Sequence, residues 1–248
     1  MDALIIAAGF GSRLRDISES KPMTPVAGVP LLELGVRQAK AAGAQRVVVV
    51  TGHEAERLES ALPALSQRAG LPVVAQRVAD WSKPNGWSVM AGAAQIAGNY
   101  LLMMSDHIFS APILTGLAQQ GGADRGVTLA VDRRIDDPLI DPDDATWVQR
   151  GEDGFIRAIG KTIPTFDAVD CGAFLCTPEL AQAIAAAIAG GQAGSLSEGM
   201  QRLADAGRAA TWEIGGAWWL DVDDPRAHAL AEAQAPLHLP EVYAAALS

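Results

Sequence analysis

The chain has 248 residues, of which 49% are hydrophobic, so it can bury a large core and its composition argues against disorder. Its formal net charge of −10 argues against a nucleic-acid-binding surface. A nucleotide substrate stays open, because a turn of backbone N–H groups and a few cations can hold phosphates on an acidic protein.

The cysteines and the apolar runs limit the class of protein. Cys171 and Cys176 are the only cysteines, which excludes a disulfide framework and a zinc pattern. We expect both to be buried and reduced, with side chains on opposite faces of one strand. The first apolar run has strand length and no basic leader, and no run approaches the ~20 residues of a membrane helix. The sequence therefore predicts a soluble, cytoplasmic protein without membrane insertion.

Strand-like and helix-like segments alternate along the first half of the chain. Continuously apolar runs predict strands that are buried on both faces, and apolar residues spaced three or four apart predict helices. This alternation predicts an α/β fold with a doubly wound, mainly parallel sheet. The expected elements are strands at 3–8, 46–50, 72–76 and 100–104, helices at 31–42, 53–65 and 87–97, and a loop at 80–86.

The pattern changes after Gly126. Residues 146–161 predict a small β-hairpin insertion, with its turn at 152–154. The Pro/Asp-rich segment 136–144 is the best candidate for a mobile loop. Further strands are expected before Asp132, at 169–176 and at 209–214, and helices at 178–189, at 197–206 and from Asp224-Pro225.

The first strand ends at a glycine-rich turn, GFGSRLRDISESKP. Leu14 stands where a dinucleotide fingerprint needs its third glycine, and no Walker-type G-x-x-x-x-G-K-[ST] is present. Gly9 and Gly11 allow backbone N–H groups to face an anion. Arg13 can bind two phosphate oxygens, and Lys21 supplies a point charge. An ordinary surface turn with solvated cations is the alternative.

Carboxylates follow other predicted strands. Asp106 comes directly after the strand at 100–104, and Asp221 and Asp223 lie on one side of a late extended segment. Ligands of such sheets bind at the carboxyl ends of strands. Together these carboxylates predict a Mg²⁺ site on substrate phosphates. Capping of the last helix, the role expected of Asp224, is the alternative for this group.

Several motifs resemble the sugar-phosphate and alcohol-phosphate nucleotidyltransferases. AAGFGSRLRDISESKPM is similar to that family's A-A-G-x-G-[ST]-R-L signature followed by K-P. SDHIF is similar to the position of its first metal carboxylate, KPNGWSVMAGAAQI to its base- and ribose-binding segment, and WLDVDDP to its late D-x-D-x-P turn. Gly160-Lys161 and FDAVDCGAFLC most resemble the inositol-1-phosphate cytidylyltransferases. Trp87 departs from the pattern, because Thr is common at that position.

The resemblance implies a single Rossmann-like, GT-A-like nucleotidyltransferase domain over residues 1–248. Its nucleotide-binding half is 1–125 and its acceptor-binding half is 126–248. The implied reaction is Mg²⁺-dependent and joins an NTP, with CTP favoured, to a phosphorylated small alcohol, with inositol 1-phosphate favoured, releasing pyrophosphate. His107 is expected to orient a neighbouring carboxylate, and Trp87 or Trp218 to line the pocket.

The resemblance also assigns residues to roles. The catalytic residues are Arg13, Lys21 and Asp106, and the metal ligands are Asp106, Asp221 and Asp223. The nucleotide-binding residues are Ala8, Gly9, Gly11, Ser12, Arg13, Thr51, Gly52, Asn85, Gly86 and Ser88, and the acceptor-binding residues are Lys161, Asp170, Gly172 and Asp132.

Other substrates and another class stay open. Phosphocholine or aminoethylphosphonate cytidylyltransferases and sugar-1-phosphate guanylyl- or uridylyltransferases fit the same motifs. Asp132, Asp170 and the tryptophans suit a cationic headgroup. A catalytically silent nucleotide-sugar sensor is the non-enzyme alternative, although intact Arg13, Lys21, Asp106 and Asp221 argue against it. The sequence leaves a homodimer open and does not decide between Asp221 and Asp223 as the principal metal ligand.

Overall fold

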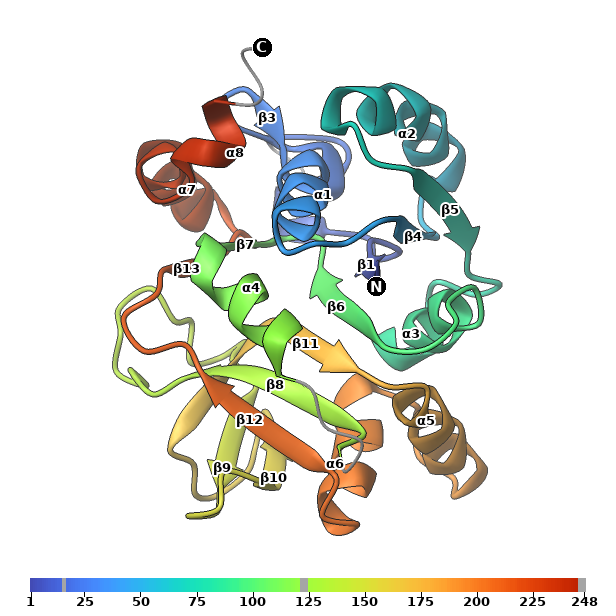
Figure 1. The fold of residues 1–248 in the computed structure, drawn as a ribbon, viewed down its shortest axis with the longest axis vertical. Coiled ribbons are helices and arrows are strands. Elements are labelled where there is room, and N and C mark those ends of the chain that lie inside the picture. Colours follow the sequence, from blue (N-terminus) through green and yellow to red (C-terminus); the bar gives the residue numbers. More distant parts are fainter. Residues whose placement is uncertain (15–16, 121–124, 245–248) are drawn as a thin grey trace.

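The computed structural model describes residues 1–14, 17–120 and 125–244. A nine-stranded sheet forms its centre, with the order β10-β9-β11-β6-β1-β4-β5 along the main path, and β8 pairs with both β11 and β12 (Figure 1). The predicted α/β class with a mainly parallel, doubly wound arrangement is confirmed in the first half of the chain. The four parallel strands there are β1 (Asp2–Ile6), β4 (Val47–Thr51), β5 (Val73–Arg77) and β6 (Tyr100–Met104).

Helices connect these parallel strands and cover the sheet. β4 is fully buried, as a strand covered on both faces must be. The connecting helices are α1 (Leu31–Ala41), α2 (Ala55–Ala69) and α3 (Asn85–Ala93). Short elements surround the glycine-rich turn: the 3₁₀ turns η1 (Ser12–Leu14) and η2 (Lys21–Met23), and the two-residue strands β2 (Pro25–Val26) and β3 (Val29–Pro30).

The second half is mixed. The predicted hairpin is confirmed, since β9 (Trp147–Arg150) and β10 (Ile156–Gly160) pair antiparallel around a turn with Gly154 at φ +77°. β11 (Ala168–Cys176) is antiparallel to β6, β8 and β9. The remaining elements are β7 (His107–Phe109), α4 (Ala111–Gln119), β8 (Val127–Asp132), α5 (Glu179–Ala189), α6 (Leu196–Asp205), β12 (Ala209–Glu213), β13 (Trp219–Asp221), α7 (Pro225–His238) and α8 (Pro240–Ala244).

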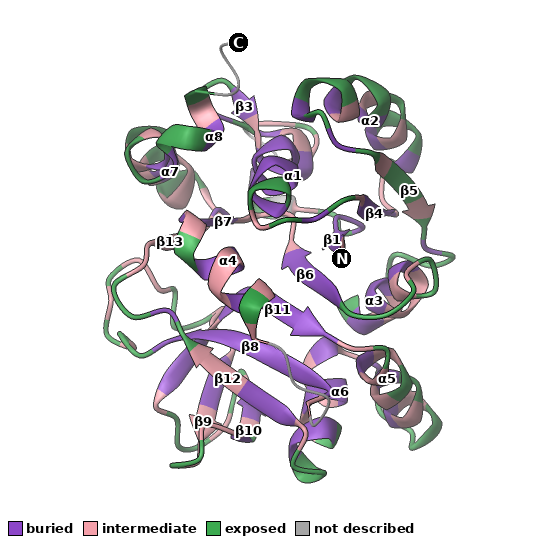
Figure 2. Cartoon of the chain, in the orientation of Figure 1, coloured by how far each residue is buried: buried purple, intermediate pink, exposed green. Residues whose placement is uncertain are grey.

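Two buried hydrophobic clusters take alternate residues of β1, Ala3 and Ile5 in one and Leu4 and Ile6 in the other, and therefore lie on opposite faces of the sheet. Cys171 belongs to one and Cys176 to the other, and both thiols are free and buried, as predicted. Figure 2 shows the central strands β6, β8 and β11 as buried. Among the helices of the described ranges, none is both long enough and apolar enough to cross a bilayer.

Two local features differ from the sequence-based expectation. α3 begins at Asn85 rather than at Trp87, because Pro84 takes the position before the helix with an extended ψ of 154°. No strand was predicted in the segment that follows β6, but this segment contains β7, which pairs antiparallel with β13. This short ladder sets His107 opposite Asp221 and thereby joins two distant parts of the chain.

Candidate functional site

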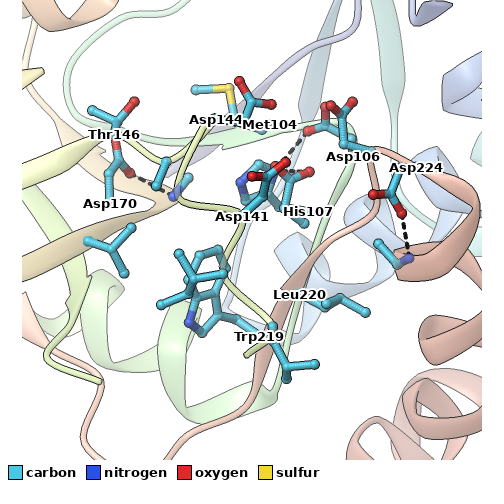
Figure 3. Close-up of a pocket in the computed structure, with 18 of the residues that line it drawn as sticks. Met104, Asp106, His107, Asp141, Asp144, Thr146, Asp170, Trp219, Leu220 and Asp224 are labelled. Carbon is cyan, nitrogen blue, oxygen red and sulfur yellow. Dashed lines mark hydrogen bonds and ion pairs between the residues drawn. The ribbon is translucent and has the colours of Figure 1, made fainter. Parts of the chain in front are cut away.

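Two adjoining cavities open at the carboxyl ends of the central strands. The aspartate cavity, about 490 Å³, is lined by residues that include Asp221 and, as Figure 3 shows, Asp106 and Asp170. The glycine-loop cavity, about 450 Å³, is lined by residues that include Gly9 and Gly11. The shared walls of the two cavities are Arg13, Asn85, Met104, Asp106 and Asp223.

The glycine-rich turn forms one wall of the glycine-loop cavity, as the sequence predicts. Gly11 has φ +60°, and a Cβ at this position would lie 2.5 Å from Cβ of Lys21. Only glycine therefore allows the Lys21 stem to pack against the turn. Ala8, Gly9, Arg13, Asn85 and Ser88 of the predicted nucleotide-binding set also line this cavity.

Lys21 lies among carboxylates where the cavities meet. Its Nζ is 2.6 Å from Oδ2 of Asp106 and donates a hydrogen bond to Oδ1 of Asp223. Burial lowers the pKa of Lys21, but the charges of Asp106, Asp221 and Asp223 outweigh it and raise that pKa above its ordinary value. Asp106 is likewise held ionised, since Lys21 and His107 lower its pKa despite burial. Lys21 is therefore a permanent cation beside the predicted metal ligands.

His107 connects two of these carboxylates. Its Nδ1 lies 2.8 Å from Oδ1 of Asp106 and 3.6 Å from Oδ1 of Asp221. Burial disfavours the imidazolium, yet the two carboxylates raise the pKa of His107 to about 9. Gly172, with φ +78°, leaves room for this ring, because a Cβ there would lie 2.5 Å from Cδ2 of His107. The contact with Asp106 is the one that the predicted orienting role requires.

The carboxylates beside His107 fit a divalent cation. Ligand atoms of Asp106, His107 and Asp221 lie within 4.8 Å of one another. Oδ1 of Asp221 is buried and accepts no hydrogen bond from the described residues. Burial also raises the pKa of Asp221 to about 6, so a nearby cation would offset a real cost of ionisation. An oxygen-rich donor set with an unsatisfied oxygen suits Mg²⁺.

The predicted acceptor residues divide into two groups. Lys161, Asp170 and Gly172 line the aspartate cavity. Oδ1 of Asp170 accepts the Gly172 N–H at 2.7 Å, and burial raises the Asp170 pKa to about 6. Asp132 lines neither large cavity; its carboxylate accepts hydrogen bonds from Arg134 and from Nε1 of Trp219. These contacts indicate a structural role for Asp132, which holds Trp219, a residue of the cavity wall.

Three residues that were predicted to bind the nucleotide line neither of the two cavities. Thr51 donates a hydrogen bond to Glu59 at 2.6 Å and is fully buried. At Gly52 a Cβ would lie 2.6 Å from Cβ of Trp81, and at Gly86 it would overlap the carbonyl oxygen of Gly194. Close packing explains these two glycines. The side chain of Ser12 lies outside the described part of the chain.

Tryptophans other than the expected ones line the cavities. Trp81 lines the glycine-loop cavity together with Lys83, and Trp219 lines the aspartate cavity. Trp87 and Trp218 instead donate hydrogen bonds to the carbonyl of Ala193 and the amide oxygen of Gln234. Trp81 carries a usable sequence signal, since it lies in the loop between a strand and the helix that begins with Asn85.

The loop between β8 and β9 supplies residues that the sequence did not assign to the site. Pro138, Asp141 and Asp144 line the aspartate cavity. Asp144 contacts both Arg13 and Lys161. In the view of Figure 3, the side chains of Asp141 and Asp144 appear between those of Asp170 and Asp106. The Pro/Asp-rich composition marked this segment as a loop but gave no sign of where its side chains lie.

Two known proteins with similar sequences align with most of this chain. It is 36% identical to a bifunctional IPC transferase and DIPP synthase of Rubrobacter xylanophilus, over 93% of this chain and 51% of that protein. The corresponding protein of Aquifex aeolicus is 28% identical, over 90% of this chain and 49% of that protein. The chain thus spans about half the length of these relatives.

Two solved structures superpose on most of this chain. The inositol-1-phosphate CTP transferase from T. maritima superposes with a TM-score of 0.81 at 22% identity, over 93% of this chain and 94% of that one. A UDP-glucose pyrophosphorylase complexed with UDP-glucose superposes with a TM-score of 0.77 at 17% identity, over 94% and 98% of the two chains. The predicted Rossmann-like, GT-A-like fold is therefore confirmed.

The sequence itself decides the family. Residues 3–146, which include the glycine-rich turn, Lys21 and Asp106, match the MobA-like NTP transferase domain. The resemblance to nucleotidyltransferases drawn from the motifs is confirmed by this match and by the relatives. The chain belongs to the family of MobA-like NTP transferase domains.

Proposed function

We propose that this chain transfers the cytidylyl group of CTP to inositol 1-phosphate and releases pyrophosphate. One observation carries the proposal: the glycine-loop cavity and the aspartate cavity meet at Asp106, with Arg13 and Asp223 on their shared wall. A triphosphate in one cavity and an acceptor phosphate in the other would come together beside Lys21. The names of the R. xylanophilus relative and the T. maritima structure support this choice of substrates.

The reaction requires positioning and charge neutralisation. A phosphate oxygen of the acceptor attacks the α-phosphorus of CTP and forms a new P–O bond. The bond from the α-phosphorus to the α–β bridging oxygen breaks, and pyrophosphate leaves with that electron pair. The attacking phosphate is largely ionised near neutral pH, since its second pKa is about 6. No general base is needed, and in-line alignment supplies most of the catalysis.

The chain's residues divide this work between the two cavities. Backbone N–H groups of the glycine-rich turn and the Arg13 guanidinium would hold the β- and γ-phosphates. Lys21 would neutralise charge that develops on the α-phosphate. Lys161 would bind the acceptor phosphate, and Asp170 would accept hydrogen bonds from acceptor hydroxyls.

The cation would be held by Asp106 with Asp221 or Asp223. When bound, Mg²⁺ supplies charge neutralisation to both phosphates. Oδ1 of Asp221 accepts no hydrogen bond from the described residues, which favours Asp221 as the principal second ligand, because Asp223 already accepts from Lys21 and contacts Arg13. His107 would keep its proton on Nδ1 and orient Asp106 rather than ligate the cation.

A substrate panel tests the proposal. Pyrophosphate release is measured with CTP, UTP, GTP and dTTP, each combined with inositol 1-phosphate, phosphocholine, aminoethylphosphonate or glucose 1-phosphate. The proposal predicts the highest kcat/KM for CTP with inositol 1-phosphate. Preference for another pair would assign one of the alternative transferases. Tight nucleotide binding without turnover for any pair would assign the sensor instead.

Location and assembly complete the proposal. We infer a cytoplasmic enzyme that acts as a monomer or a homodimer and has no nucleic-acid partner. Cell fractionation with an antibody to the chain tests the location, and the mass of the purified protein from light scattering tests the assembly.

A further inference from the structure

A single carboxylate on the loop between β8 and β9 joins the two sides of the site. Oδ2 of Asp144 lies 3.0 Å from Nη1 of Arg13, and its Oδ1 accepts a hydrogen bond from Nζ of Lys161. Arg13 belongs to the turn after β1, whereas Lys161 directly follows β10. Asp144 therefore links a cation of the nucleotide side to a cation of the acceptor side.

The contact forms part of an alternating row of charges. Arg13 also contacts Asp223, which in turn accepts from Lys21, and Lys21 contacts Asp106. Each of these cations, which are proposed to bind phosphate, already has a carboxylate partner within the chain. Phosphates that enter the site must therefore replace carboxylates around Arg13, Lys21 and Lys161.

Asp144 differs from the other carboxylates in this row. Asp106 lies in the group of atoms that fit a cation, whereas Asp144 does not belong to that group. Its two oxygens are instead divided between two cations, as the oxygens of a phosphate would be. Burial raises its pKa, but hydrogen bonds from Lys161 and Arg13 lower it to about 2. The side chain is therefore an anion throughout the working pH range.

We propose that Asp144 is a positioning residue that takes the place of a phosphate between Arg13 and Lys161 until substrates bind. The inference rests on the proposed function, because it assigns phosphate binding to both cations. The side chains of Arg13 and Lys161, which line the aspartate cavity, are 48% and 56% exposed. Asp144 is the carboxylate that contacts both of them, and Arg13 has a second carboxylate partner in Asp223. Asp144 keeps them there and releases them when phosphates arrive.

Neutralising Asp144 is therefore expected to have two opposite effects. Phosphate binding tightens, because Lys161 no longer gives up Asp144 as a partner, and Arg13 gives up Asp223 alone rather than Asp144 and Asp223. Turnover falls, because two long, half-exposed side chains lose the contact that orients them. A role limited to holding the loop would weaken binding and turnover together, so the two hypotheses differ in the sign of the binding effect.

Calorimetric titration with inorganic pyrophosphate measures the first effect, with and without Mg²⁺. We expect Asp144→Asn to bind pyrophosphate about fivefold more tightly than the unchanged chain, as loss of a partly exposed competing ion pair allows. Asp143→Asn is the matched control, since it makes the same charge change on the same loop at an exposed side chain. In the described part of the chain, the ion pairs of Arg13 and Lys161 are made with Asp144 and Asp223, not with Asp143. Its affinity should change less than twofold, about the scale of a long-range screened charge.

Steady-state kinetics measures the second effect on the same proteins. For Asp144→Asn we expect kcat to fall about tenfold while the KM for the nucleotide does not rise. Melting curves confirm that each variant is folded. An Arg13→Ala background supplies a second route, because there Asp144→Asn should lose most of its effect on pyrophosphate binding.

The outcomes separate the inference from the proposed function. Equal or weaker pyrophosphate binding by folded Asp144→Asn overturns the inference while leaving nucleotidyl transfer intact. Absence of pyrophosphate binding by both the unchanged chain and the variant contradicts the inference and the proposed function together. Tighter binding with lower kcat supports the inference.

Discussion

His107 and Asp221 stand opposite each other in the short β7–β13 ladder, with Nδ1 and Oδ1 3.6 Å apart. The ladder brings a carboxylate from the late turn to the end of β6, where Asp106 lies. A second contact from Nδ1 to Asp106 ties both carboxylates to one ring. The geometry of the proposed cation site thus depends on backbone pairing between distant segments.

Replacing Lys21 is expected to remove much of the catalysis. Lys21→Ala should lower kcat/KM by about 100-fold or more, equivalent to ~3 kcal/mol, because a preorganised charge beside the α-phosphate is lost. Lys40→Ala, a lysine that donates to the carbonyl of Ala69 away from the cavities, serves as the control. A Lys21→Ala protein with kcat/KM within threefold of the unchanged chain would refute the assigned role.

The metal ligands can be ranked by their Mg²⁺ dependence. Asp106→Ala should abolish measurable turnover even in excess Mg²⁺, since it lies at the meeting point of the cavities. Asp221→Asn should raise the Mg²⁺ concentration for half-activation more than Asp223→Asn does, because Oδ1 of Asp221 accepts no hydrogen bond from the described residues, whereas Asp223 accepts one from Lys21. The reverse order would identify Asp223 as the principal second ligand.

Gly172 should resist substitution for two separable reasons. Gly172→Ala places a side chain at φ +78° and a Cβ 2.5 Å from the His107 ring. Gly154→Ala imposes similar backbone strain at φ +77°, with nothing within 4 Å of the added Cβ. Thermal unfolding should show a loss of about 1–2 kcal/mol for Gly154→Ala and a larger one for Gly172→Ala. Equal losses would mean that the His107 ring moves aside for the added Cβ without lowering the free energy of unfolding.

The protonation of His107 predicts how stability depends on pH. Folding raises its pKa from 6.5 to about 9, so its contribution is complete below about pH 6.5 and is lost as pH rises through 9. Urea unfolding in EDTA should show the free energy of unfolding falling over this window. His107→Gln should reduce that fall, and an unchanged pH profile in the variant would exclude His107 as its source.

The sequence predicts those features that depend on local pattern. β4 follows from a run of valines, and the glycine-rich turn from residues that stand together in the chain. The β7–β13 ladder was not predicted, because a strand of three residues is too short to show a periodic pattern. The pairing of two such strands also depends on tertiary packing. Asp132 was assigned to the acceptor because it follows a strand, yet Arg134, two residues later, pairs with it. Asp144 was not assigned to the site, because hydrophobic periodicity does not predict the path of a loop.

Transfer of label from CTP tests the central claim most directly. The chain is incubated with Mg²⁺, inositol 1-phosphate and CTP labelled at the α-phosphate. The account predicts that the label enters a product that contains both cytidine and inositol, with one pyrophosphate released per transfer. Label that remains in CTP, or that appears only as free CMP, would contradict nucleotidyl transfer to this acceptor.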